Sequence, residues 1–457
     1  MKFKQILTGA LVAASLLVAG QVAAQERLTV WWNKGFYPAE DAALATAIQR
    51  FEEATNIQVD LSLFPTHDVI PKTVAALAAG NPPDVAYGDL FDFQVTGRWA
   101  YENKLADLSS VINPIRARFA PQTVETTFLH NSVTNRRAYY AFPLRQQTIH
   151  IHYWVDMLTE AGLTAADIPT TWTAFWDFWC VTAQRAHRRA TRERSFGVGQ
   201  PMGVGSSDAF YSFLTFADTH NVRLVDDNGK LLVGDPKVRQ GLINAMTDYV
   251  SFYKRGCTPP SAPNWRDPDN NVAFHNQATM MTHNASISIV AKWLDDAANP
   301  ALTAEQRATA KKNYTERIRT VGFPSRPDGT QMRYRASVKT GVVFREARNK
   351  ENALRFVAFL LEDRNLTPLV EGSLGRWFPV TIAGQQSAFW QADPHRRTVH
   401  SQFAAGTIPF EFTKNFRFTT LNMENVWARA MNRVTLENIP VDRAVDEMIA
   451  RIKEVAG

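Results

Sequence analysis

The sequence predicts an α/β fold, because strand and helix patterns alternate from the start of its folded part. A short apolar run at 28–32 ends in Asn33-Lys34-Gly35, as a buried strand followed by a turn would. Apolar residues at helical spacing predict a helix over 39–53, and strict alternation over 57–63 predicts a second strand. A helix between two strands acts as a crossover, which favours parallel strands with helices packed on the sheet.

The alternation continues with a predicted helix over 70–77 and a predicted strand over 84–87, separated by Gly80-Asn81-Pro82-Pro83. In open parallel sheets, ligands bind beyond the carboxyl ends of the strands. We therefore expect a binding site at that edge, which carries Trp31, Trp32, Tyr87 and Asp89.

Later elements are fewer and less regular. Apolar periodicity predicts helices over 172–189, 235–255, 352–361 and 441–455. Short extended pieces are expected at 139–143 and 148–153, around Arg145-Gln146-Gln147, and 197–205 is expected to be a glycine-punctuated loop. A chain of 457 residues suggests two or three folded units, at roughly 150 residues each.

Composition excludes several classes of protein. The chain is 45% apolar and 21% charged, which is ordinary for a globular protein and excludes disordered and fibrous classes. A formal charge of +6 is mild for this length, and no nucleic-acid partner is expected from it. Two cysteines exclude a disulfide-rich scaffold and an all-cysteine zinc site.

The first residues predict export. Lys2 and Lys4 precede an apolar run over 6–19, and small residues lead to Ala24, which is the pattern of a signal peptide covering 1–24. The alternative, a membrane anchor, needs about 20 apolar residues, and this run is shorter. We expect a soluble periplasmic protein. In that oxidising compartment Cys180 and Cys257 are a possible disulfide, and two buried free thiols are the alternative.

Several stretches together resemble a known family, the extracellular solute-binding proteins of ABC importers, in the carbohydrate-binding group that includes maltose-binding proteins. The resemblance covers nearly the whole mature chain. It is carried by Phe51-Glu-Glu-Ala-Thr-Asn-Ile-Gln-Val59, Ala75-Ala-Leu-Ala-Ala-Gly-Asn-Pro-Pro-Asp84, Tyr140-Ala-Phe-Pro-Leu144, Tyr153-Trp154, Ala161-Gly162-Leu163, Pro169-Thr-Thr-Trp172, Phe274-His-Asn-Gln-Ala-Thr-Met-Met281, 338–344, 349–361 and Gly375-Arg-Trp-Phe-Pro-Val380.

The resemblance implies two α/β lobes, each a sheet flanked by helices, joined by three hinge crossings. By analogy, the first lobe is expected to hold 25–141 and 325–371, and the second 142–324 and 372–457. The resemblance also implies a function: capture of a carbohydrate-like solute in the cleft between the lobes, and delivery to ABC permease subunits. We expect a monomer with no enzymatic activity, no cofactor and no metal.

Sugars present apolar faces that suit aromatic rings, and hydroxyls that suit carboxylates, amides and arginine. The predicted ligand-binding residues are Trp31, Trp32, Lys34, Tyr87, Asp89, Arg145, Gln146, His283, Asn284, Arg376 and Trp377. Met281-Thr-His-Asn-Ala-Ser-Ile287 departs from the family pattern, because it lacks a tryptophan and has Ala285 in place of glycine.

Structural alternatives stay open for most of these residues. One of Trp31 and Trp32 would belong to the core, since neighbours on a strand face opposite ways, and Tyr87 could pack beneath the loop. Asp89 could cap a following helix. The remaining alternatives are ion pairs between the lobes for Arg145 and Arg376, a solvated turn for Lys34, and a hydrogen-bonded strand end for His283-Asn284.

Two other ligands or activities remain open. Lys34, Arg145 and Arg376 near one cleft would also suit a sugar phosphate, a sugar acid or a glycerophosphodiester. An exported glycoside-processing enzyme would need two carboxylates about 5–10 Å apart, which no motif indicates. His150 and His152 face the same way on a predicted strand and could chelate a metal, but satisfied strand histidines are commoner.

Overall fold

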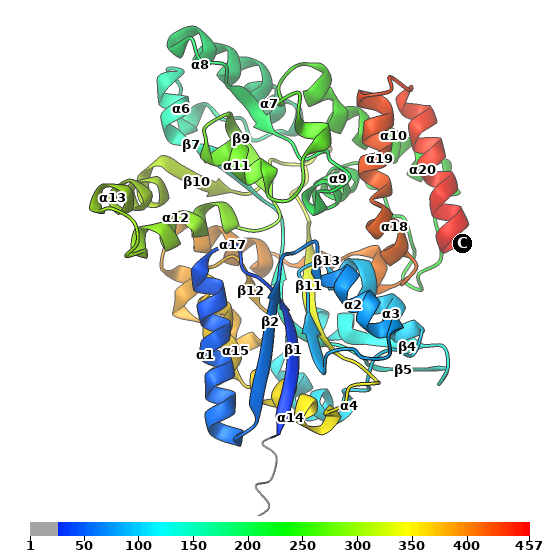
Figure 1. The fold of residues 1–457 in the computed structure, drawn as a ribbon. Helices are drawn as coiled ribbons and strands as arrows, with labels where there is room; N and C mark the ends of the chain where they lie inside the picture. The colour runs from blue at the N-terminus through cyan, green and yellow to red at the C-terminus, as the bar shows by residue number, and fades with distance from the viewer. Residues whose placement is uncertain (1–25) are drawn as a thin grey trace, which may run out of the picture.

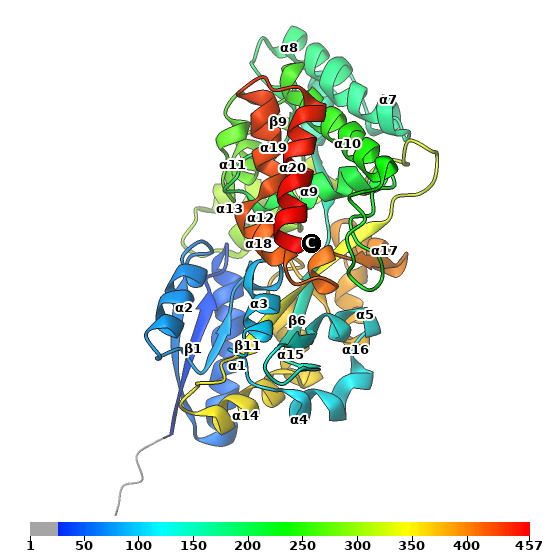
Figure 2. The same cartoon turned by 90° about the vertical axis from the view of Figure 1, so that its right-hand side faces the viewer.

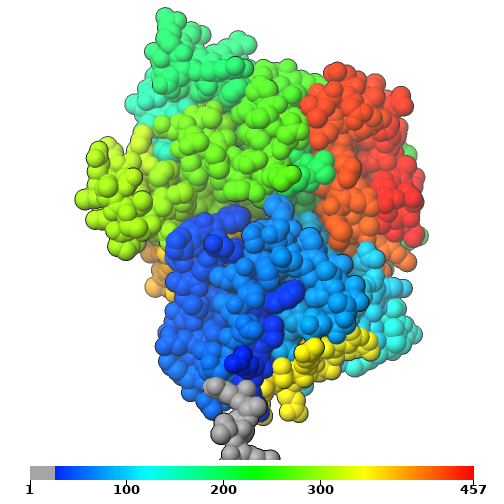
Figure 3. All heavy atoms as spheres, in the orientation of Figure 1, coloured from blue at the N-terminus to red at the C-terminus, as the bar shows by residue number. Residues whose placement is uncertain are grey.

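The computed structural model describes residues 26–457, which form two lobes built on separate sheets. In Figure 1 the first lobe, with β1 and β2, lies at the bottom, and the second, with β7 and β9, lies at the top. Figure 3 shows the two lobes meeting where the blue N-terminal segments touch the green ones. The predicted α/β two-lobed fold is confirmed. The predicted signal peptide, 1–24, lies outside the described residues.

The first lobe is built on a seven-stranded sheet in the order β12-β6-β11-β3-β1-β2, with β13 paired to β11. Its strands are β1 (Arg27–Asn33), β2 (Gln58–Phe64), β3 (Val85–Tyr87), β6 (Phe142–Gln147), β11 (Tyr334–Val343), β12 (Phe378–Pro379) and β13 (Thr407–Pro409). A separate hairpin joins β4 (Phe128–Asn131) to β5 (Arg136–Tyr139). The helices of the first lobe are α1 (Pro38–Thr55), α2 (Val69–Ala78), α3 (Gly97–Tyr101), α4 (Ser109–Ile112), α5 (Pro121–Val124), α14 (Lys350–Leu360), α15 (Asp363–Glu371) and α16 (Ile382–Gln385).

The N-terminal strand–helix alternation folds as predicted. β1 pairs in parallel with β2 and with β3, so the carboxyl ends of these three strands meet at one edge. α1 ends at Asn56, which adopts the left-handed conformation (φ 58°) that asparagine tolerates. The sheet becomes mixed farther along, because β11 runs antiparallel to both β3 and β6.

The second lobe has a four-stranded sheet in the order β10-β7-β9-β8. Its strands are β7 (His150–Trp154), β8 (Phe196–Gly199), β9 (Thr279–Asn284) and β10 (Ile318–Val321). Its helices are α6 (Val155–Glu160), α7 (Trp172–Asp177), α8 (Gln184–Thr191), α9 (Ser207–Thr219), α10 (Pro236–Lys254), α11 (Asp269–His275), α12 (Ser288–Ala298), α13 (Ala304–Lys312), α18 (Phe418–Glu424), α19 (Val426–Thr435) and α20 (Val441–Ala456). Figure 2 shows α19 and α20 lying against α9 and α10.

The chain passes between the sheets three times, after β6, between β10 and β11, and after β13. The boundary predicted at residue 372 is therefore wrong in part. β12 and β13 hydrogen-bond within the first lobe's sheet, although 372–457 was expected in the second lobe. The predicted change of lobe at 142 falls at the end of β6 instead, because that whole strand pairs with β11. α17 (Pro394–Ala404), which lies between β12 and β13 in the chain, packs against β10 of the second lobe.

Two further local expectations can be compared with the structure. The predicted helix over 172–189 is continuous from α7 to α8, with wide turns over 178–183. The prediction of a loop over 197–205 is wrong for residues 197–199, because they belong to β8. That strand requires Gly197, since a Cβ there would lie 2.1 Å from the carbonyl oxygen of Trp179.

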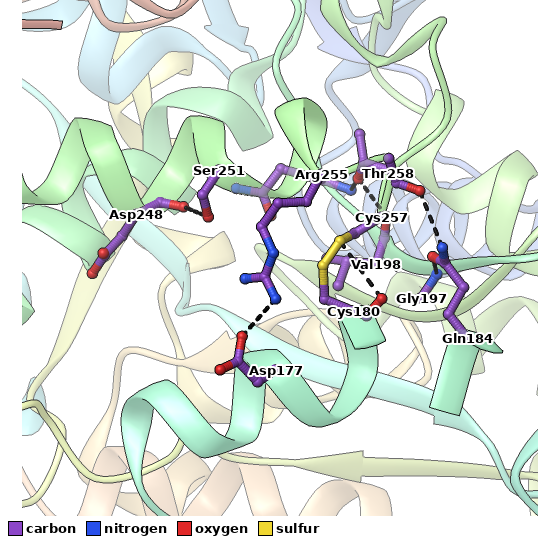
Figure 4. Close-up of a disulfide and its surroundings, with 12 residues drawn as sticks. Asp177, Cys180, Gln184, Gly197, Val198, Asp248, Ser251, Arg255, Cys257 and Thr258 are labelled. Atoms are coloured by element: carbon purple, nitrogen blue, oxygen red, sulfur yellow. Dashed lines mark hydrogen bonds and ion pairs between the residues drawn. A yellow bond between two sulfur atoms is a disulfide. The ribbon is translucent and has the colours of Figure 1, made fainter. Parts of the chain in front are cut away.

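A disulfide fastens the far end of the second lobe. Cys180 and Cys257 are joined, with their Cα atoms 4.9 Å apart, a usual separation for a disulfide. Figure 4 shows the bond beside β8, with Arg255 Nη2 donating to Asp177 Oδ1 at 2.6 Å nearby. Over residues 26–457 no helix has both the length and the apolar character that crossing a bilayer would need.

Candidate ligand-binding cleft

A cavity lies between the two lobes. The first lobe lines it from the carboxyl end of β3, from β11 and from the segment before β12. The second lobe lines it from the start of α9, from α11 and from the loop after β9. The lining residues are Phe36, Thr66, Asp89, Leu90, Gln147, Ser207, Asp208, Tyr211, Asp267, Pro268, Asn270, Asn271, Asn284, Ala285, Ser286, Ser288, Lys339, Arg376 and Trp377.

The first lobe presents a wall of paired charges, which we call the first wall: Asp89, Lys339, Arg376 and Trp377, backed by Glu40 and Arg145. Arg376 Nη1 donates to both carboxylate oxygens of Glu40, at 2.8 and 2.9 Å, and Nη2 donates to Asp89 Oδ2 at 2.9 Å. The Trp377 indole nitrogen donates to Glu40 as well, at 3.1 Å. Both Nη atoms of Arg376 are thus engaged with two carboxylates of its own lobe, while its buried Nε has no hydrogen-bond partner within residues 26–457.

Arg145 lies behind this wall and is not free to meet a ligand. Its Nε donates to the Tyr87 hydroxyl at 2.9 Å, and that hydroxyl donates to Asp89 Oδ1 at 2.7 Å. Its guanidinium lies 4.7 Å from the Tyr87 ring centre and 4.4 Å from that of Trp377. Arg145 therefore holds Tyr87, Asp89 and Trp377 in one rigid arrangement.

Lys339 connects the wall to the opposite lobe. Its ammonium donates to the Asp89 carbonyl at 2.7 Å, to Asp92 Oδ1 at 3.2 Å and to the Tyr211 hydroxyl at 2.8 Å. Tyr211 belongs to α9 and also lies 3.2 Å from the hydroxyl of Ser337. These bonds cross between the lobes and join α9 to β11.

Electrostatics keep Asp89 ionised although it is buried. Burial raises the pKa of a carboxyl group, but the charges of Arg376 and Arg145 outweigh that effect and hold the pKa of Asp89 below its usual value. Each cation of the first wall is thus matched by a carboxylate, so the wall offers a ligand little net charge.

The second lobe contributes the second wall: Asp208, Asp267, Asn270, Asn271, Asn284 and Ser288. Asp267 caps the start of α9, because Oδ2 accepts from the Ser207 backbone N–H and Oδ1 from the Ser206 hydroxyl, both at 2.9 Å. Asn270 Nδ2 donates to Asp208 Oδ2 at 3.1 Å and to Asn284 Oδ1 at 3.0 Å. The wall is thus an amide, hydroxyl and carboxyl network.

Two atoms of this wall stand out. Burial, with the neighbouring charge of Asp267, raises the pKa of Asp208 to about 8, so its carboxyl group is mostly protonated at neutral pH. Asn271 donates to the Ser288 hydroxyl at 3.2 Å, while its buried carbonyl oxygen has no hydrogen-bond partner within residues 26–457. An unsatisfied buried acceptor is costly, and a ligand hydroxyl would relieve it.

Four predicted residues line the cavity: Asp89, Asn284, Arg376 and Trp377. Tyr87 and Arg145 lie directly behind them, as the contacts above show. The alternative of ion pairs between lobes does not hold for Arg145 and Arg376, since Glu40 and Asp89 belong to the same lobe as both arginines.

Two further predicted residues, His283 and Gln146, lie outside the cleft. The His283 side chain is buried in the second lobe, bonded to Ser212 and Gln200 and surrounded by aromatic rings. On β9 it faces away from Asn284, because successive strand residues point to opposite faces. For the same reason Gln146 faces Pro379 within the first sheet, and Gln147 reaches the cavity instead.

The N-terminal aromatic predictions are also wrong for the cleft. Trp32 is buried against Tyr87, with ring centres 4.6 Å apart, and Trp31 packs edge-on against Phe64. Lys34 is exposed in the turn, as its structural alternative held. Phe36 lines the cavity instead and is 40% exposed, with Arg376 3.8 Å from its ring centre.

Sequence reasoning missed most of the second wall. The run Asp267-Pro268-Asp269-Asn270-Asn271 was a usable signal, because polar residues crowd a helix start there. Lys339 gave a weaker signal, as one cation inside the long apolar strand β11. His150 and His152 contact Gln402 and Thr320, so both rings have protein partners.

A family model of bacterial extracellular solute-binding proteins matches residues 46–398, which is more than half of the chain. The chain belongs to this family. No curated protein matches the sequence.

Solved structures similar to this solute-binding protein share its fold at low sequence identity. One is an ABC transporter solute-binding protein from Thermotoga lettingae TMO bound with alpha-D-tagatose, with a TM-score of 0.75 and 18% identity over 94% of this chain and 100% of that one. Another is maltose-bound MalE3 of T. maritima, with a TM-score of 0.72 and 17% identity over 94% and 99% of the two chains. A third is the sugar-binding protein MalE from Xanthomonas citri, with a TM-score of 0.66 and 17% identity over 94% and 97%.

Proposed function

We propose that this solute-binding protein captures an uncharged carbohydrate in the cleft between its lobes and delivers it to an ABC permease in the membrane. The observation that carries the proposal is the charge state of the cleft. Each cation of the first wall is paired with carboxylates, and the second wall offers amide, hydroxyl and carboxyl groups. Such groups suit the hydroxyls of a neutral sugar.

The same observation argues against the charged alternatives. A sugar phosphate, sugar acid or glycerophosphodiester needs an unpaired cation or a free helix N-terminus. Arg376, Arg145 and Lys339 are already engaged, and Asp267 caps α9 beside the cleft. An anion would also face the Asp208–Asp267 pair. Binding it would leave charges of like sign close together in a buried site.

Delivery depends on closure around the guest. Residues from both lobes line the cavity, so a bound sugar would contact both and stabilise the closed arrangement. Similar solved structures hold tagatose, maltose and laminaribiose, which supports a carbohydrate here. A second cavity shares Thr66, Leu90, Ser207 and Asp267 with the first, so the two adjoin.

We infer that the protein binds its sugar without cleaving it. Cleavage requires one carboxyl group as acid and a second, free carboxylate as nucleophile or base. Asp89 is held on both oxygens by Arg145, Tyr87 and Arg376, and both oxygens of Asp267 are occupied by the start of α9. Asp208, whose pKa is raised, has no free partner carboxylate.

Export to the periplasm, action as a monomer and absence of nucleic-acid partners complete the proposal. They rest on the signal-peptide pattern at 1–24 and on the mild formal charge of +6.

A thermal-shift screen tests the ligand class, because a ligand that binds only the folded state raises the melting temperature. The screen compares neutral mono- and disaccharides with polyols, sugar acids, sugar phosphates and glycerophosphodiesters. We expect a neutral sugar to raise the melting temperature and the charged analogues to have little effect. A shift from charged compounds alone would reject the proposal. Release from chromogenic glycosides would reject the non-enzymatic part.

A further inference from the structure

Another open cavity lies at the junction of the lobes and shares no lining residue with the sugar cleft. It is bordered by the end of α9, the segment after it, β11 and β13. Two of the three chain crossings thus pass this pocket, which we call the hinge pocket. Its cationic residues are Arg223, Arg326, Arg333, Arg335 and Lys414.

The hinge pocket has more cations than carboxylates. Its five cationic side chains face three lining carboxylates, and Asp328 beside Arg326 is a fourth, which leaves a formal surplus of one positive charge. Arg335 accounts for two of the carboxylates, since it donates to both oxygens of Asp218, at 2.6 and 2.8 Å, and to Glu411 at 3.0 Å. The sugar cleft is different, because its cations are all matched.

Two of the remaining cations share one carboxylate. Arg223 Nη2 and Lys414 Nζ both donate to the same oxygen of Asp227, at 2.8 Å each. Arg333 is exposed and forms no ion pair or hydrogen bond within residues 26–457. Arg326 is engaged: its Nη2 donates to the Asp218 carbonyl at 2.9 Å and to Asn221 Oδ1, and its Nη1 donates to the Thr330 hydroxyl at 3.3 Å and pairs with Asp328 at 3.8 Å. Positive charge is thus left without a counter-charge inside a concave site.

We propose that the hinge pocket binds an anion that carries a phosphate group. Guanidinium groups match phosphate oxygens with paired N–H donors, and several arginines around one cavity favour a multiply charged anion over a monocarboxylate. Arg333, Arg223 and Lys414 together face one carboxylate, Asp227, so an anion there would meet positive charge that no side chain neutralises. The ligand would contact Arg333, Arg223 and Lys414 without breaking the Arg335–Asp218 pair.

Titration calorimetry of the mature protein with inorganic phosphate and with pyrophosphate, at low and constant ionic strength, tests this site. We expect saturable binding of one anion per chain. Arg333→Gln and Lys414→Gln should each weaken it by about ten-fold, the loss of one charge-assisted hydrogen bond. Arg355→Gln is the matched control and should change nothing, because this exposed arginine belongs to α14, which lies at the bottom of the first lobe in Figure 1, away from the junction.

The proposal is overturned if binding does not saturate, or if Arg355→Gln weakens it as much as Arg333→Gln. Because Arg333 makes no contact, its variant should fold normally, and an unchanged unfolding curve checks this. A second arm adds phosphatidylglycerol vesicles. Co-sedimentation that Arg333→Gln abolishes would assign the phosphate to a lipid headgroup, whereas binding of free phosphate alone would assign a soluble anion.

Discussion

The two walls of the cleft between the lobes differ in how their buried polar groups are paired. In the first wall, buried arginine, lysine and carboxylate side chains pair with one another, and the Nε of Arg376 is the one guanidinium nitrogen of that residue left without a partner within residues 26–457. In the second wall, amides and hydroxyls carry most of the network, one carboxyl group has its pKa raised, and one carbonyl oxygen is unsatisfied. From this contrast we infer that the first wall is a rigid platform and that the second wall recognises the ligand through hydrogen bonds.

The largest effect is expected from breaking the platform. Asp89→Asn removes the charge that Arg145 and Arg376 share, and leaves buried positive charge without compensation. Loss of one partner in a buried ion network typically costs about 3–5 kcal/mol. Denaturant unfolding should show that loss as a lower midpoint.

The matched control is Asp446→Asn, which removes an exposed ion pair with Arg239. Exposed pairs contribute about 0–1 kcal/mol, so this variant should unfold near the wild-type midpoint. Equal losses for the two variants would mean that the first wall is not a preformed network.

The stability of the folded protein should depend on pH through Asp208 of the second wall. Asp208 has a pKa of about 8 in the folded protein, against 3.8 as its ordinary value, so the folded state holds a proton that the unfolded state releases between these values. Its contribution to stability therefore falls as pH rises from about 4 to 8, by up to about 1.4 kcal/mol per pH unit. Asp208→Asn lacks this titration.

Melting temperatures of the wild type and Asp208→Asn, measured from pH 5 to pH 9, check this expectation. The variant should gain on the wild type as pH rises, and the gain should level off above about pH 8, where the folded carboxyl is ionised as well. A difference that stays constant with pH would show that the Asp208 carboxyl is not perturbed.

A smaller effect, on ligand affinity, is expected at Asn271. Its unsatisfied oxygen is the acceptor we assign to a sugar hydroxyl, so Asn271→Ala should weaken sugar binding by about ten-fold. The exposed Asn228 is the matched control, and Asn228→Ala should bind like the wild type in calorimetry. Unchanged affinity for Asn271→Ala would remove this residue from the site.

The smallest effect concerns the cleft mouth. Phe36→Ala should weaken sugar binding by about five-fold, since one partly exposed ring contributes about 1 kcal/mol. Phe128 is similarly exposed and lies on a separate hairpin, so Phe128→Ala is the control and should leave affinity unchanged. Equal affinities for the two variants would exclude Phe36 from sugar contact.

The same contrast explains what the sequence could predict. Local patterns predicted β1 to β3 and the helix end at Asn56, because strand alternation and helix endings depend on residues that are close in the sequence. First-wall residues such as Asp89 and Arg376 were found through strand ends and family motifs. Their mutual pairing was not predicted, since it joins residues 287 positions apart.

The second wall was harder, because it depends on side-chain direction. A one-residue alternation decides that Asn284 reaches the cleft while His283 enters the core, and that Gln147 reaches it while Gln146 does not. The raised pKa of Asp208 depends on burial and on Asp267, which is distant in sequence. Composition and spacing carry no record of such contacts.

Small-angle X-ray scattering, with and without a saturating amount of the sugar found by the screen, tests the central claim most directly. If the sugar draws together a preformed first wall and a ligand-reading second wall, the radius of gyration falls on binding. Asn271→Ala should reach the same compact state at higher sugar concentration. A radius of gyration that stays constant while calorimetry shows full occupancy would contradict the account.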